Sequence, residues 1–322
     1  MKKAIILFNL LFLSLFCYAQ QNEFIVAENY FRNNEYQKAI QLYKKLHDKS
    51  PYNNTFLKRL ITCYQETEQF LVAENLLSKK TKEKPNLTYL NVIRGYNFER
   101  QQNDIEATKY YQKALKSLDK KNSRYGGVIA NLFKNYNKLD FAIEAYSKTM
   151  SNNPNANYGF QLAQIHGEKG DFSEMFASYV DLVDKNEKYL NNVKRFTSRY
   201  IDDNPENENN VLFKKALLRK SISNPKDIWN DLLSWLFVKQ KQYSKALIQN
   251  KALLARNADN LAKIAELGKI AFDNKEYETA KECFDLIIEK SNYPSDKFSA
   301  INNNLKIAIE TNQTDVDNQF KN

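Results

Sequence analysis

Apolar residues recur along the chain at the spacing of amphipathic α-helices, and the helical stretches come in pairs. Short polar breaks, such as residues 32–35, separate one stretch from the next. The chain has 322 residues but only seven glycines and six prolines, too few for a protein rich in tight turns. The pattern therefore predicts an all-α chain of paired helices.

The pattern has a fixed period. Ala39, Ala73 and Ala107 are each 34 residues apart, and Pro51 and Pro85 have the same spacing. Such a period indicates repeated helix pairs, because one pair cannot bury both of its apolar faces and must stack on its neighbours. Small residues fit where two helices cross closely, and aromatic residues fill the space between pairs.

The first unit, AENYFRNNEYQKAIQLYKKL, resembles the tetratricopeptide repeat. The residues that carry the resemblance are Ala27, Tyr30, Tyr36, Ala39, Tyr43, Leu46 and Pro51. It extends over about residues 21–291. The resemblance implies a right-handed α-solenoid of about eight helix pairs with a concave inner surface.

The units divide the chain into five segments. A degenerate unit between the regular ones should form helices over residues 188–201 and 209–222, with a hinge near 202–210, where Pro205 and polar residues favour a turn. An amphipathic stretch over residues 296–310 should cap the last apolar face. The expected segments are a signal peptide (1–19), units one to five (20–186), the degenerate repeat (187–226), units seven and eight (227–292), and the capping helix with a polar tail (293–322).

The first nineteen residues have the features of a signal peptide. Lys2 and Lys3 precede the apolar run of residues 4–16, and Ala19 is a small residue at the expected cleavage site. A permanent anchor is the rival interpretation, but the run is shorter than the about 20 residues that cross a bilayer. Lipoprotein processing at Cys17 is less favoured, because Phe16 is bulky. We expect an exported protein, periplasmic, envelope-associated or secreted, with no membrane span after cleavage.

The net charge of +10 changes this interpretation little, because basic and acidic residues are interspersed along the helices. Nucleic-acid binding would require a basic stripe, so we expect no nucleic-acid partner. An acidic protein or an anionic surface is compatible with the charge. Cys63 and Cys283 lie six repeats apart, too far for a disulfide, and should be buried free thiols.

The sequence contains none of the motifs that would indicate an enzyme. His47 and His166 are the two histidines, and neither has a second histidine at ligand spacing. We expect His166 to pack in a tyrosine position of the repeat, and His47 to be solvent-facing or favoured by a helix dipole. Gly126-Gly127 lacks the lysine and serine of a phosphate-binding loop. We therefore predict no catalytic, cofactor-binding or metal-binding residues.

What remains is a binding surface. In tetratricopeptide arrays the first helix of each unit lines the groove, so the resemblance implies a site for a peptide segment or helix of another protein. The alternative for each aromatic residue is packing against a neighbouring helix. The alternative function is a structural or assembly module of an envelope or secretion complex, binding through its convex face or its ends. The candidate groove residues are Phe31, Lys58, Tyr89, Tyr96, Arg100, Arg124, Asn131 and Lys134.

Overall fold

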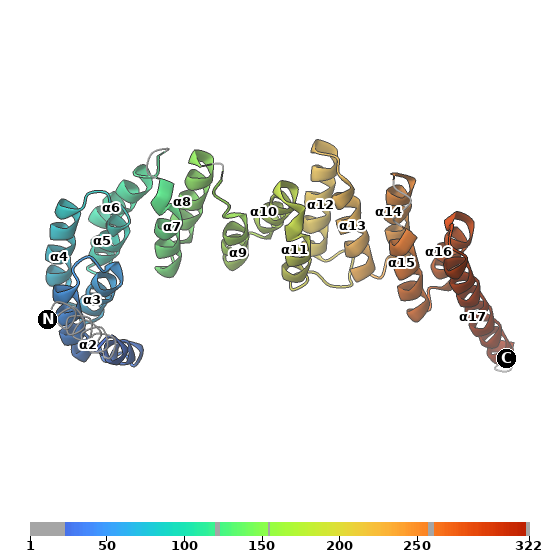
Figure 1. The fold of residues 1–322 in the computed structure, drawn as a ribbon, viewed down its shortest axis with the longest axis horizontal. Helices are drawn as coiled ribbons and strands as arrows, with labels where there is room; N and C mark the ends of the chain where they lie inside the picture. The colour runs from blue at the N-terminus through green and yellow to red at the C-terminus, as the bar shows by residue number, and fades with distance from the viewer. Residues whose placement is uncertain (1–22, 120–122, 154, 257–260, 320–322) are drawn as a thin grey trace, which may run out of the picture. The chain divides into compact units, whose positions relative to one another are not determined.

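The structure, a computed structural model, describes residues 23–119, 123–153, 155–256 and 261–319 (Figure 1). These residues form α-helices and two short 3-10 turns and contain no β-strand, which confirms the predicted all-α class. Contacts divide the chain into an N-terminal unit ending at Tyr158 and a C-terminal unit beginning at Gly159. The predicted signal peptide and Pro154 lie outside the described residues.

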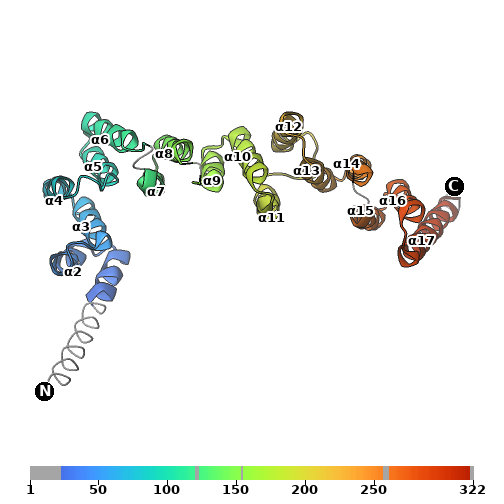
Figure 2. The same cartoon turned by 45° about the horizontal axis from the view of Figure 1, so that its top comes forward.

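The N-terminal unit contains four consecutive helix pairs. Within it, α5 lies beside α6 and α7 beside α8 (Figures 1 and 2). A 3-10 turn, Ser123–Tyr125, precedes α7. The helices are residues 23–32, α2 (Tyr36–Lys49), α3 (Asn54–Glu66), α4 (Phe70–Glu83), α5 (Leu90–Glu99), α6 (Asp104–Lys116), α7 (Gly126–Asn135) and α8 (Leu139–Asn152).

A recurring turn joins the two helices of most pairs. Its central residue has a positive φ, and the next backbone N–H donates to a carbonyl near the end of the first helix. Glu35 N to Tyr30 O and Gln69 N to Tyr64 O are both 2.8 Å. This geometry ends a helix by satisfying a carbonyl that has no partner inside it. In the described residues the positive-φ positions are Asn34, Glu68, Gln102, Asn137, Gly170, Lys241 and Lys275.

The repeated small residues lie where the helices cross. Ala39, Ala73 and Ala107 are all buried. A Cβ added to Gly95 would lie 2.5 Å from the Tyr111 ring, so only glycine lets α5 and α6 approach as they do. The predicted role of the repeated small residues is confirmed at these positions.

The C-terminal unit contains close pairs and one exception. α9 packs on α10, α13 on α14 and α15 on α16, and α17 then packs on α16 (Figures 1 and 2). The helices are α9 (Gly159–Lys169), α10 (Phe172–Lys185), α11 (Leu190–Thr197), α12 (Glu208–Ser223), α13 (Asp227–Lys239), α14 (Tyr243–Arg256), α15 (Leu261–Asp273), α16 (Tyr277–Lys290) and α17 (Pro294–Gln319).

The exception is the segment predicted as a degenerate unit. α11 is shorter than the expected helix over 188–201, and a long connection follows it before α12 begins at Glu208. α12 packs on α10 and α13 more closely than on α11. The buried Asn210 side chain closes the connection by donating to the carbonyls of Asp202 (3.0 Å) and Asn204 (2.6 Å). The hinge near 202–210 stays a prediction.

The last helix is longer than expected. α17 begins at Pro294 and continues to Gln319, so most of the segment expected as a polar tail is helical backbone. Among the described residues, no helix combines the length and the apolar character that crossing a bilayer would require. The right-handed sense of the helix stack, which the resemblance implies, stays a prediction.

Candidate functional site

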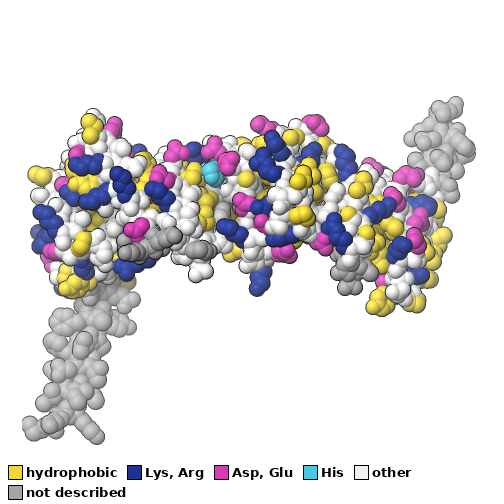
Figure 3. All heavy atoms as spheres, turned by 90° about the horizontal axis from the view of Figure 1, so that it is seen from above, with side chains coloured by type: hydrophobic (Ala, Val, Ile, Leu, Met, Phe, Trp, Pro, Cys, Tyr) yellow, Lys and Arg dark blue, Asp and Glu magenta, His cyan; other side chains and the backbone are white. Residues whose placement is uncertain are grey.

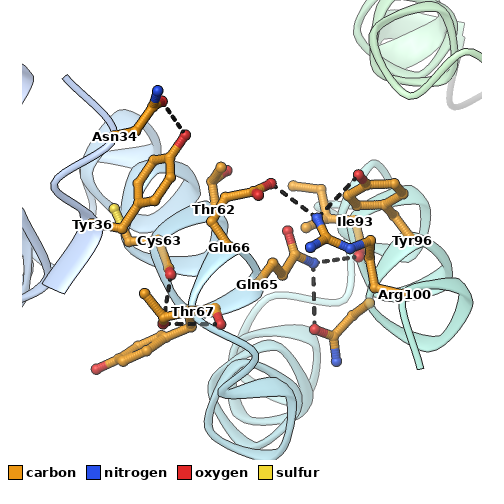
Figure 4. A network of polar contacts seen from close by, with 12 residues as sticks. Asn34, Tyr36, Thr62, Cys63, Gln65, Glu66, Thr67, Ile93, Tyr96 and Arg100 are labelled. Atoms are coloured by element: carbon orange, nitrogen blue, oxygen red, sulfur yellow. Dashed lines mark hydrogen bonds and ion pairs between the residues drawn. The ribbon is translucent and has the colours of Figure 1, made fainter. Parts of the chain in front are cut away.

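The first helices of the N-terminal unit carry a polar network around Arg100 (Figure 4). The Arg100 Nη1 atom donates to Glu66 Oε1 at 3.0 Å, which links α5 to α3, and lies 3.5 Å from Tyr96 Oη. These contacts with Tyr96 and Glu66 raise the pKa of Arg100, so the guanidinium stays charged. Both partners of the ion pair remain 30% exposed, so another molecule can reach the charges.

Tyr96 forms the aromatic side of this network. Its ring stacks on that of Tyr136, with centroids 3.9 Å apart and planes 4° from parallel. Tyr136 directly follows α7 as its C-cap, so the stack links α5 to the next first helix. Burial raises the pKa of Tyr136, which keeps the phenol neutral. A stacked aromatic pair therefore lies next to a charged pair.

Buried amides hold α3, α4 and α5 in register below the network. The Gln65 Nε2 atom donates to Ile93 O at 3.3 Å and to Asn97 Oδ1 at 3.4 Å. Asn97 Nδ2 in turn donates to Phe70 O at 3.1 Å. Because a buried amide costs free energy unless it is hydrogen-bonded, these contacts fix how the helices align.

A second ion pair links the first two helix pairs of the N-terminal unit. Arg59 donates to both carboxylate oxygens of Glu28, at 2.8 Å from Nε and 3.0 Å from Nη2. The same guanidinium lies over the ring of Phe31, 4.2 Å from its centroid. Phe31 also meets Tyr43 edge to face. Phe31 is therefore half-buried, and its ring contributes to helix packing as well as to the accessible surface.

Tyr89 requires a correction. It was expected on the exposed groove, but its side chain is only 3% exposed and its ring lies 5.5 Å from that of Tyr125. Burial raises its pKa to about 12. Tyr89 immediately precedes α5, where the chain turns inward with Leu87 and Leu90, and so its side chain enters the core.

The remaining candidates lie on first helices or just before one. Lys58 on α3 and Lys134 on α7 are half-buried, and Asn131 is exposed. Asn131 Oδ1 accepts a hydrogen bond from Tyr146 Oη at 2.7 Å. Arg124 is exposed and donates to Tyr125 Oη at 2.6 Å. We call Phe31, Lys58, Glu66, Tyr96, Arg100, Asn131 and Lys134 the first-helix face.

Glu66 and Tyr136 belong to this site although the sequence analysis did not single them out. Glu66 and Arg100 are 34 residues apart and thus hold the same position in successive units. The 34-residue spacing could have identified Glu66. No spacing pointed to Tyr136, because its stacking on Tyr96 depends on how two helix pairs pack.

The histidines and cysteines of the described residues are buried or half-buried. His47 was expected to be solvent-facing or favoured by a helix dipole. It lies in the last turn of α2 but is buried, and burial with the nearby Lys80 lowers its pKa. Cys63 and Cys283 are free and buried as predicted, and burial raises the pKa of each thiol to about 12. His166 is half-buried beside Asp171, as packing predicts. In the described part of the chain, no three His, Cys, Asp or Glu side chains converge as metal ligands would.

The C-terminal unit has its own charged link between first helices. Asp231 on α13 lies 3.4 Å from Lys194 on α11 and 3.2 Å from Lys263 on α15. The half-buried Trp235 lies one helical turn further along α13, edge to face with Phe213. Basic and acidic side chains both occur along the face shown in Figure 3, as their interspersion in the sequence predicts.

No family model matches the chain, and no curated protein matches it. Several solved structures do, at low similarity. The C-terminal part of a tetratricopeptide-repeat protein from Cytophaga hutchinsonii is 17% identical, with 85% of this chain and 97% of that chain covered and a TM-score of 0.31. A tetratricopeptide-repeat protein of Thermus thermophilus is 14% identical, with 56% and 97% covered and a TM-score of 0.33.

PilF of Pseudomonas aeruginosa is 15% identical, with 66% of this chain and 96% of that chain covered and a TM-score of 0.32. Scores and identities this low carry no argument about function. The likeness to tetratricopeptide repeats therefore rests on this chain's own features, namely the 34-residue period, the helix pairs and the buried small residues at their crossings.

Proposed function

We propose that the protein is an exported, non-enzymatic scaffold that binds a segment or helix of another protein on the first-helix face of its N-terminal unit. The observation that carries this proposal is the half-exposed Arg100–Glu66 ion pair beside the Tyr96–Tyr136 stack. Arginine and tyrosine are the side chains that dominate binding energy at interfaces. Here Tyr96 and Arg100 lie on α5 and at its end, and buried amides hold α5 in register with α3 and α4.

The experiment compares two double variants. Tyr96→Ala with Arg100→Ala removes the aromatic and the cation from the first-helix face. The matched control, Arg94→Ala with Tyr110→Ala, removes the same residue types elsewhere in the α5/α6 pair, where Arg94 lies over Tyr110 and pairs with Glu74. The purified proteins are used to capture partners from the envelope fraction.

Only the Tyr96/Arg100 variant should lose capture, by about 30-fold or more if these residues form a hot spot. Both variants should keep their helical circular dichroism. Glu66→Gln refines the test, because it removes the internal partner of Arg100 while leaving the guanidinium available. Equal capture by the wild type and the Tyr96/Arg100 variant would show that the first-helix face does not bind the partner.

The second candidate function is an assembly module that binds through the second helices. Specific observations favour it, since Leu71 on α4, Ile105 on α6 and Ile248 on α14 are all exposed apolar side chains. Crosslinks from a captured complex would separate the two functions. Links mapping to α3, α5 and α7 favour the first-helix face, and links to α4, α6 and α14 favour the module.

The proposed export rests on the basic start and apolar run of the leader. Cell fractionation and N-terminal sequencing test it. A mature chain beginning at Gln20 in an envelope or extracellular fraction would support export with cleavage. An uncleaved chain in the membrane would favour the anchor, and a lipid-modified Cys17 would favour lipoprotein processing.

A further inference from the structure

A hollow on the N-terminal unit lies between second helices. It is formed by the C-terminal halves of α2 and α4 and by the turn that follows α2, and its volume is about 470 Å³. His47, Tyr52, Lys79 and Lys80 are part of its wall, and we call it the basic hollow. None of the residues of the first-helix face lines it, so it is a separate feature of the unit.

Two polar side chains are buried in the wall of the basic hollow. His47 is 6% exposed and Lys80 is 7% exposed. At the 34-residue spacing, Lys80 corresponds to Leu46 and Ala114, which are both buried apolar side chains. Burying an ammonium group costs free energy that a leucine or an alanine would not cost. Such a departure from the pattern of the repeat, at this cost, is typical of a functional site.

Both side chains have hydrogen-bonding capacity left over. Lys80 Nζ donates to Pro51 O at 3.4 Å and to Glu83 Oε2 at 3.2 Å. Both contacts are longer than the about 2.8 Å typical of a charged hydrogen bond, and an ammonium group has a third N–H. His47 Nδ1 is buried and has no hydrogen-bond partner among the described residues. An acceptor bound in the hollow would satisfy both groups.

The charge around the basic hollow selects an anion. Residues 44–52 and 76–84 contain seven lysines but only two carboxylates, Asp48 and Glu83, which both line the hollow. Glu83 lies 3.2 Å from Lys80 and 4.0 Å from Lys79. A third carboxylate, Glu23, pairs with two more of the lysines. The carbonyl ends of α2 and α4 repel an anion, but their partial charges are smaller than a full charge and act only within a turn. The excess of lysine therefore decides the sign.

We propose that the basic hollow is a binding site for a phosphate group. Lys79 and Lys80 supply the charge, and His47 Nδ1 supplies a directed donor for one of the phosphate oxygens.

The surroundings of the hollow show how large the ligand is. A volume of about 470 Å³ exceeds what a phosphate ion fills, so a phosphate group carried by a larger molecule also fits. Tyr52 at the rim is 77% exposed, and Lys84 Nζ lies 4.1 Å from the centroid of its ring. Tyrosine and lysine side chains together are typical of contacts with the headgroups of an anionic membrane. The phosphate group is therefore either free or part of a lipid headgroup, and the two sources are separated below.

The two histidines of the chain make the test direct, because the NMR signals of both imidazoles can be followed separately. The purified protein is titrated with inorganic phosphate at constant ionic strength, with chloride as the compensating anion. The His47 signals should shift until the site is saturated, and the pKa of His47 should rise, since a bound anion stabilises the imidazolium. His166 lies beside Asp171 in the C-terminal unit and is the internal control. Its signals should not move.

Three variants test the residues of the site. Lys80→Gln should weaken phosphate binding by about tenfold or more, because it removes a buried charge. Lys79→Gln should weaken it by about two- to five-fold, and this exposed residue keeps the test valid if Lys80→Gln does not fold. The matched control is Lys113→Gln, an exposed lysine 34 residues after Lys79 and thus at the same position of the next pair. This variant should bind like the wild type.

Vesicles identify the source of the phosphate group. The protein is sedimented with phosphatidylglycerol vesicles and, for comparison, with uncharged phosphatidylcholine vesicles. Binding to the anionic vesicles that Lys80→Gln and Tyr52→Ala both reduce would support a lipid headgroup. A His47 shift with inorganic phosphate, without binding to vesicles, would support a free phosphate. The proposal is overturned if phosphate leaves the His47 signals unchanged and vesicle binding does not depend on Lys80. A loss in Lys113→Gln equal to that in Lys79→Gln would also overturn it.

Discussion

The α5/α6 pair and the α11/α12 segment occupy comparable places in the repeat order but are built differently. α5 ends in the recurring positive-φ turn at Gln102, and Gly95 lets α6 lie directly on it. α11 ends without that turn, a longer connection follows, and α12 packs on α10 and α13. A helix pair in this protein thus needs both a small crossing residue and a tight turn, and a helical pattern alone does not produce it.

The largest effect should come from the crossing residue. In Gly95→Ala the new Cβ would meet the Tyr111 ring at 2.5 Å and the Ala107 carbonyl oxygen at 3.0 Å. We expect the free energy of unfolding to fall by about 2–3 kcal/mol, measured by chemical denaturation. Tyr111→Leu in the same chain should recover part of the loss, and fully additive effects would show that the ring is not the obstacle.

The next effect concerns the long connection before α12. Asn210→Leu would leave the carbonyls of Asp202 and Asn204 without their donor, at a cost of about 1–3 kcal/mol for the buried groups. Hydrogen exchange of residues 198–207 should accelerate more than exchange in α5 and α6. Asn209→Leu is the neighbouring control, and equal acceleration in both variants would mean that the Asn210 side chain does not close the segment.

Substitutions in the recurring turn should change the stability less, and in either direction. Gly170 has a φ of +80°, so Gly170→Ala should destabilise the α9/α10 pair by about 1 kcal/mol. Glu68 has a φ of 58° at the equivalent turn, so Glu68→Gly should stabilise its pair by up to about 1 kcal/mol. Thermal unfolding of both variants checks the signs, and a loss of stability in Glu68→Gly would show that its side chain contributes more than the strain costs.

The smallest expected effect is the pH dependence of stability that comes from His47. Close packing of the regular pairs buries this side chain. Burial holds its pKa below the unfolded value of 6.5, so the unfolded chain binds more protons as the pH falls. Stability should therefore be fully present above about pH 6.5 and decrease as the pH falls below it. His47→Gln should remove this part of the pH dependence, and an unchanged profile would place the titration elsewhere.

Much of the candidate site could be predicted, because position in the repeat indicates which face of a helix a residue occupies. Tyr96 and Arg100 were identified in this way, and the structure places them in one network. Tyr89 was placed wrongly for a local reason. It lies just before its helix begins, where helical periodicity no longer determines the direction of a side chain.

The sequence alone determined the helices, their pairing in most units and the buried small residues, because these depend on a local 3.6-residue period and on a 34-residue spacing. Only the tertiary structure decided which charges meet. Glu28 and Arg59 join helices of different repeats, and any acid and base on those faces would match the pattern equally well. Packing on α16 also decided which face of α17 turns inward, because Ala300 and Ile307 are buried while the larger Phe298, Leu305 and Ile309 stay exposed.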